Sequence, residues 1–119
     1  VLFPSEGALS LDEVPEPITR IVVLDATWQK CPGMVLHPNI KSLRRIKINN
    51  YTTTYWRIHN KSLDHLSTIE AIYYFYKEYQ TSLHGSYNGE YDDLLYFFAH
   101  FYQIVKKRVD NSKQKRLEQ

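Results

Sequence analysis

The chain has 119 residues and a net charge of +2, with 43% hydrophobic and 24% charged residues, as is typical of one globular domain. Its single cysteine, Cys31, excludes an internal disulfide and a metal site made of several thiolates. No apolar run is long enough to cross a bilayer, and no signal-peptide pattern opens the chain. These features predict a protein of the nucleus or the cytoplasm with no membrane partner.

Residues 1–3 and 20–25 are the first two predicted strands, the first ended by Pro4 and the second made of continuous aliphatic residues. Two further strands are expected at 44–48 and 52–58. A helix is predicted to begin after residue 25, with Thr27 as a possible cap, and to be shortened or kinked at Pro32 and Gly33. Strands followed by helices predict an α/β fold.

Two amphipathic helices follow. Apolar residues spaced by three and four form one stripe over 69–83 and another over 94–109. Ser67 and Glu70 have the spacing of a capping box at the start of the first helix. Residues 110–119 are polar and basic, and we expect them to form a disordered tail after a domain that covers 1–109.

Two basic clusters are candidate RNA-binding surfaces. One contains Arg44 and Arg45, and the other contains Lys106, Lys107 and Arg108. Such clusters can neutralise phosphates, but basic segments are about as common on proteins that bind no nucleic acid. The clusters alone therefore leave both interpretations open.

The first stretch that could carry chemistry is 3–8 (Phe-Pro-Ser-Glu-Gly-Ala). Gly7 would let a ligand approach the backbone, and Ser5 and Glu6 could bond to that ligand. An ordinary tight turn explains the same residues, and without further context it is the more common interpretation.

The second stretch, 25–28 (Asp-Ala-Thr-Trp), follows a predicted buried strand. Ligands bind at the carboxyl ends of strands in parallel sheets, and Asp25 there could take a proton or orient a nucleophile. Thr27 could cap a helix and Trp28 could form an apolar wall. The alternative, in which Asp25 is a turn residue and Trp28 belongs to the core, is at least as common.

The third stretch, 66–71 (Leu-Ser-Thr-Ile-Glu-Ala), places Ser67 and Thr68 at a helix N-terminus, which suits a carboxylate or phosphate. The capping box alone also accounts for Ser67 and Glu70. Arg57 could clamp a carboxylate or an RNA phosphate, although an exposed structural arginine is the default. The five histidines show no metal-ligand spacing, so no metal site is predicted.

Taken in this order, the three stretches resemble the characteristic blocks of the DTW domain, which is named for its Asp-x-Thr-Trp signature. The resemblance covers residues 1 to about 108 and continues in 72–75, 91–95 and 102–106. It implies an α/β fold, a SPOUT-like sheet with flanking helices and a knotted cofactor site. It also implies that the domain has a further N-terminal part before Val1.

The activity that the resemblance implies is that of a tRNA-uridine aminocarboxypropyltransferase. Such an enzyme transfers the 3-amino-3-carboxypropyl group of S-adenosylmethionine to N3 of a uridine in tRNA and releases methylthioadenosine. Asp25 would be the catalytic base or would orient the uracil, and Arg57 would contact the carboxylate or the RNA. Glu70 would pair with the cofactor's ammonium group. The cofactor pocket would be lined by Ser5, Glu6, Gly7, Thr27, Trp28, Ser67, Thr68 and Glu70.

Two other functions stay open. A SPOUT-type RNA methyltransferase would use the same cofactor but release S-adenosylhomocysteine. A non-catalytic RNA-binding module would need only the basic clusters and the exposed tyrosines, with no affinity for the cofactor. The sequence identifies neither the tRNA nor the modified position, and it leaves the oligomeric state open.

Overall fold

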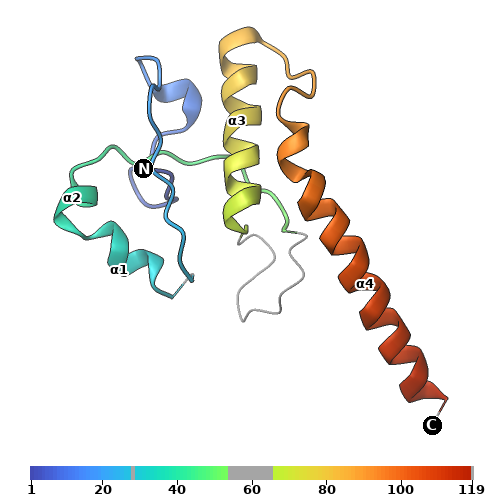
Figure 1. Cartoon of the computed structure of the whole chain (residues 1–119). Coiled ribbons are helices and arrows are strands. Elements are labelled where there is room, and N and C mark those ends of the chain that lie inside the picture. Colours follow the sequence, from blue (N-terminus) through green and yellow to red (C-terminus); the bar gives the residue numbers. More distant parts are fainter. Residues whose placement is uncertain (28, 54–65, 119) are drawn as a thin grey trace.

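The computed structural model describes residues 1–27, 29–53 and 66–118. Its regular elements are η1 (Leu11–Glu13), α1 (Cys31–Val35), α2 (Pro38–Lys41), α3 (Thr68–His84), η2 (Asp92–Leu95) and α4 (Tyr96–Leu117). Figure 1 shows α3 between the N-terminal segments, with α1 and α2, and the long helix α4. Among the described residues, no helix combines the length and the apolar character needed to span a membrane.

The predicted α/β fold with a SPOUT-like sheet is wrong for the residues that the structure describes, which form helices and no strand. The expected strands appear only as isolated parallel bridges, which pair Leu2 with Val23, Leu2 with Ile46, and Leu9 with Ile46. Leu2 N donates to Val22 O over 3.0 Å, and Ile46 N donates to Val1 O over 2.9 Å. The aliphatic segments therefore do lie side by side, but each pair meets at a single position.

The reason lies in the first segment, which is too short to carry a ladder. Pro4 has no N–H to donate, and a turn closed by the Ala8 N to Ser5 O bond of 3.0 Å follows at once. A sheet needs hydrogen bonds that repeat along both chains, and three extended residues cannot supply them. Residues 54–58 of the last predicted strand lie outside the described residues.

The helix expected directly after residue 25 begins later. Thr27 O accepts from Lys30 N over 2.9 Å and from Cys31 N over 3.1 Å, so Thr27 belongs to a turn. Lys30 is the N-cap of α1, and Pro32 lies in its first turn, where a missing N–H and a fixed φ are tolerated. Pro32 thus helps to begin the short helix instead of kinking a longer one.

Helix α3 confirms the amphipathic stripe and the capping box. Ser67 is its N-cap and Glu70 its third residue, and Gly85 ends it with a φ of 78°, a conformation that glycine adopts without strain. One face of α3 packs against the N-terminal segments. The Tyr79 hydroxyl accepts from Ile18 N over 2.8 Å, which ties the helix to a loop 61 residues earlier.

The core is small and joins three parts of the chain. Its buried members are Leu11, Ile46 and Phe75, and apolar residues from the N-terminal segments and α3 surround them. Burial of apolar surface is the main favourable term in folding. The contact between α3 and the irregular N-terminal half therefore positions the loops that carry the first two sequence stretches.

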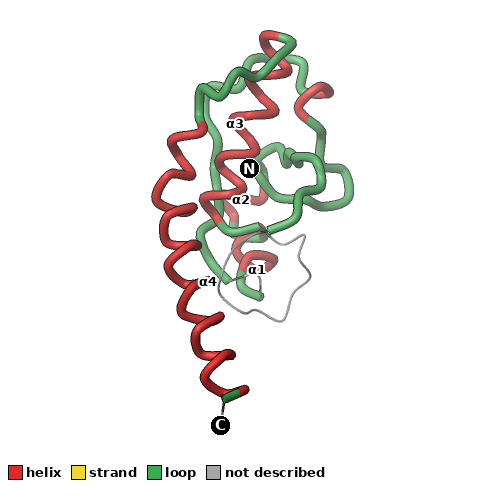
Figure 2. Tube along the Cα trace, turned by 90° about the vertical axis from the view of Figure 1, so that its right-hand side faces the viewer, coloured by secondary structure: helices red, strands yellow, loops and turns green. Residues whose placement is uncertain are grey.

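Helix α4 begins directly after η2 and runs to Leu117. It includes residues 110–117, which the composition alone had assigned to a disordered tail; the domain boundary at 109 stays a prediction. None of the residues of α4 is buried. In both views its C-terminal half projects beyond the other described elements (Figures 1 and 2).

Candidate functional site

A side-chain hydrogen bond joins the second and third sequence stretches. The Thr68 hydroxyl, in the first turn of α3, donates to Asp25 Oδ1 over 2.8 Å. Asp25 directly follows the aliphatic run 21–24 and lies 43 residues before Thr68 in the chain. The contact fixes one oxygen of an exposed carboxylate at the start of a long helix, where the helix dipole favours negative charge.

The first stretch runs in the same direction as the segment that leads to Asp25. Leu2 is bridged in parallel to Val23, so two residues further along each segment stand Pro4 and Asp25. The turn at residues 5–7 thus emerges on the same side as the Asp25 carboxylate. The structure therefore joins the second and third stretches by a hydrogen bond, and the first stretch leaves the paired segments on the same side.

Arg45 anchors this turn. Its Nη1 donates to Ser5 Oγ over 3.0 Å, and its guanidinium lies 5.8 Å from the centre of the Phe3 ring, within the range of a cation–π contact. Arg45 is half-buried and holds the loop from within; its predicted contact with RNA stays a prediction. Arg44 is instead exposed and pairs with Glu16 over 2.7 Å.

Gly7 sits at the tip of the turn with a φ of 78°. A Cβ built at this position would meet no atom within 4 Å. The glycine is therefore required by its backbone conformation, and the space around it is open. Glu6 beside it is exposed and Ser5 is half-buried.

Glu70, the predicted partner of the cofactor's ammonium group, lies buried in the cap of α3. Its side chain is 3% exposed, and its Oε1 accepts from Thr53 Oγ1 over 2.7 Å, from Ser67 Oγ over 2.7 Å and from Ser67 N over 3.1 Å. Buried polar groups are normally hydrogen-bonded, and these bonds account for Glu70 as a capping residue. Ser67 is committed to the same cap, so Thr68 is the residue of this stretch that faces Asp25.

Cys31 is buried beside the loop at residues 25–27. Its Sγ donates to Ala26 O over 3.6 Å, and burial, followed by the negative charge of Asp25, raises the pKa of the thiol. A raised pKa keeps the sulfur protonated and unreactive at neutral pH. Cys31 therefore supports the loop at residues 25–27 as a small apolar side chain.

The remaining predicted residues fall elsewhere. Trp28 and Arg57 lie outside the described residues. Lys106, Lys107 and Arg108 are exposed on α4, which contacts η2. The sequence did not predict that Thr53 bonds to the capping box. Thr53 and Glu70 are 17 residues apart, and no local pattern links them.

The chain belongs to the DTW domain family: the family's model matches residues 1–106. It is 37% identical over 91 residues to tRNA-uridine aminocarboxypropyltransferase 1 of Xenopus tropicalis, covering 74% of this chain and 31% of that protein. The Homo sapiens protein of the same name is 35% identical over 91 residues, with 75% and 30% covered. The Rattus norvegicus protein is 33% identical over 100 residues, with 82% and 33% covered.

The chain thus spans about a third of the length of these curated relatives. No solved structure matches it significantly. The family assignment therefore comes from the sequence blocks and the family's model, and the geometry of the site comes from this structure alone.

Proposed function

We propose that this chain carries the catalytic part of a tRNA-uridine aminocarboxypropyltransferase, which modifies N3 of a uridine in tRNA with S-adenosylmethionine as donor. The observation that carries the proposal is the hydrogen bond between Thr68 and Asp25. It joins two of the family's blocks around one exposed carboxylate. Family membership and the names of the curated relatives support the same activity.

The described residues fit such a donor in part. Asp25 supplies a carboxylate, Thr68 supplies a hydroxyl, and the turn at Gly7 leaves open space beside the backbone. Glu70 is buried in the cap of α3 and stays a predicted pocket residue. Thr27 is exposed and stays a predicted pocket residue.

Asp25 acts on the nucleophile. Uridine N3–H is a weak acid, and the Asp25 carboxylate accepts its proton as N3 bonds to carbon. S-adenosylmethionine supplies the aminocarboxypropyl group, whose carbon–sulfur bond breaks to release methylthioadenosine. Thr68 holds Asp25 by one oxygen and leaves the carboxylate exposed. Such alignment of base and nucleophile supplies much of the rate in group transfer.

We propose that the reaction takes place in the nucleus or the cytoplasm. Cys31 is a buried free thiol and the sequence holds no second cysteine, which suits a reducing compartment. The exposed cations of α4 and Arg44 are the proposed tRNA contacts.

The test is to incubate the protein with S-adenosylmethionine and unmodified total tRNA and to quantify both possible cofactor products by mass spectrometry. We expect methylthioadenosine that depends on tRNA. S-adenosylhomocysteine would instead identify an RNA methyltransferase. RNA binding with neither product would identify a non-catalytic RNA-binding module, and either result would contradict the proposal.

A further inference from the structure

Two phenyl rings stand open to solvent on α4. Phe97 is 67% exposed and Phe101 is 50% exposed. Their spacing of four residues places them on one face, about 6 Å apart along the helix axis. Aromatic residues usually bury most of their surface, so two exposed rings on one face point to a ligand.

The rings have aromatic neighbours that restrict their positions. The Tyr96 and Phe97 ring centres are 5.2 Å apart with planes at 86°. The His100 and Phe101 ring centres are 5.7 Å apart with planes at 62°. Both are edge contacts of favourable geometry. The N-terminal half of α4 therefore presents a group of aromatic rings that remain accessible.

The C-terminal half of the same helix is strongly basic. Asp110 is the one acid between residues 96 and 117, against six cations: Lys106, Lys107, Arg108, Lys113, Lys115 and Arg116. All six are exposed. Such a density of positive charge attracts a polyanion and repels another copy of the same surface.

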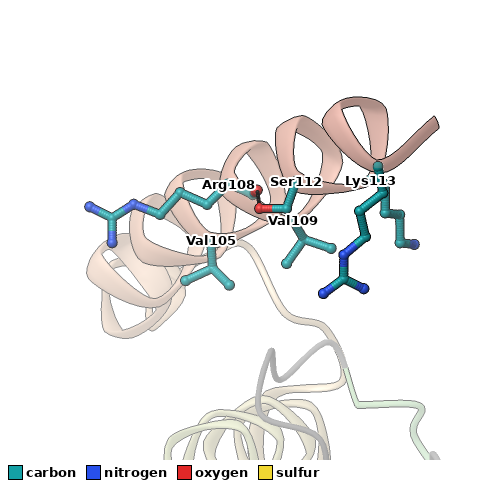
Figure 3. Close-up of a pocket in the computed structure, with 6 residues that line it drawn as sticks. Val105, Arg108, Val109, Ser112 and Lys113 are labelled. Atoms are coloured by element: carbon teal, nitrogen blue, oxygen red, sulfur yellow. Dashed lines mark hydrogen bonds between the residues drawn. The ribbon is translucent and has the colours of Figure 1, made fainter. Parts of the chain in front are cut away.

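A shallow hollow lies along the basic half of α4. It is lined by Val105, Arg108, Val109, Ser112, Lys113 and Arg116. Figure 3 shows Arg108 extended along the helix toward its N-terminal half, while Val105 and Val109 point into the hollow. Arg108 therefore points from the basic half toward the N-terminal half of α4 (Figure 3), which carries the two rings.

From this arrangement we infer that α4 binds an unpaired loop of RNA, with bases stacked on Phe97 and Phe101 and phosphates held by Arg108 and the cations beyond it. The inference rests on the proposed function, since it names the part of the tRNA that this chain grips. Aromatic rings beside a positive track form the recurring platform for single-stranded nucleic acid. A paired duplex offers phosphates but no open base faces, so it would use only the basic half of α4.

The experiment compares two labelled RNAs by fluorescence anisotropy without cofactor: a hairpin with an unpaired loop and a blunt duplex of equal length. F97A and F101A are each expected to weaken hairpin binding roughly tenfold and to leave duplex binding within about twofold. F97Y and F101Y keep a ring and should bind like the unmutated protein. F97L and F101L keep apolar area without a ring and should resemble the alanine variants.

Arg108→Gln supplies the matching control for charge. This variant should weaken the binding of both RNAs to the same extent. It should also reduce the slope of log affinity against log salt by about 1. Because the rings are exposed, circular dichroism should show unchanged helix content in all these variants.

Equal losses on hairpin and duplex, or leucine variants that bind like the unmutated protein, would overturn the inference. A dimer that F101A dissociates would show instead that a second copy covers the rings. Failure of loop binding with tRNA-dependent methylthioadenosine still formed would reject only the role of α4. Loop binding without either cofactor product would reject the proposed catalysis and leave this inference standing.

Discussion

Helices α3 and α4 are both long and rich in aromatic residues, yet their side chains meet opposite surroundings. On α3, Phe75 is 2% exposed and packs with Leu11 and Ile46, whereas on α4 Phe97 and Phe101 face solvent. The first helix thus positions loops and a carboxylate, and the second presents a surface. The comparison separates residues that build the site from residues that are free to contact a partner.

The largest expected difference concerns matched phenylalanine variants of the two helices. Phe75→Ala should lower the free energy of unfolding by about 4 kcal/mol, because it removes a buried ring and leaves a cavity. Phe101→Ala should change it by less than about 0.5 kcal/mol. Urea denaturation followed by circular dichroism measures both. Similar losses in the two variants would contradict the assignment of α4 as an accessible surface.

The next largest loss of stability is expected when the carboxylate that caps α3 is removed. Glu70→Ala should lower the free energy of unfolding by about 3 kcal/mol, because it leaves the buried hydroxyl of Thr53 and the cap donors of Ser67 without this acceptor. Glu90, an exposed carboxylate that accepts from Asn88 N over 2.9 Å, is the matched control. Glu90→Ala should cost less than about 0.5 kcal/mol in the same denaturation series. Equal losses in the free energy of unfolding would show that the capping carboxylate stabilises the protein no more than an exposed one does.

A smaller effect concerns pH at the junction of the two helices. The hydroxyls of Tyr87 and Tyr73 donate to Asp92 Oδ1 over 2.6 and 2.9 Å and lower the pKa of this carboxyl. A lowered folded pKa means stabilisation that is present above the unfolded value of about 3.9 and lost as the pH falls through the folded pKa. The effect is modest because Asp92 is exposed.

The measurement is the urea midpoint at pH 6 and at pH 3. Asp92→Asn should reduce the drop between these values, and Asp93→Asn, its exposed neighbour, should leave the drop unchanged. Glu13 contributes in the same pH range, because hydrogen bonds from Ser10 lower its pKa too, so some dependence should persist. If the urea midpoint of the Asp92 variant fell as far as that of the unmutated protein, the hydrogen bonds to Asp92 would be excluded as a source of the pH dependence.

The start and the buried face of α3 were predictable from the sequence, since their signals are local. The capping box at Ser67 and Glu70 and the apolar stripe of α3 set the start and the buried face of that helix. The sheet was mispredicted because aliphatic runs report burial, whereas a ladder depends on how many residues a partner segment can pair. Here Pro4 limits that number.

The site was predictable as a set of stretches but not as an arrangement. The three blocks were identified in order, yet the bond between Thr68 and Asp25 spans 43 residues and follows from tertiary packing. Two residues make contacts that the sequence did not indicate, for the same reason. Arg45, expected on RNA, holds Ser5, and Glu70, expected in the pocket, is enclosed by Thr53 and Ser67.

The central claim is that Asp25, aligned by Thr68, activates the uridine. The most direct test is a double-mutant cycle on single-turnover methylthioadenosine formation with tRNA. Asp25→Asn should slow the step at least about 100-fold and Thr68→Val roughly tenfold. The double variant should be no slower than Asp25→Asn alone, because Thr68 acts through Asp25. An exposed control, Asp12→Asn, should keep the unmutated rate. Retention of that rate by Asp25→Asn, or fully additive losses in the double variant, would contradict the account.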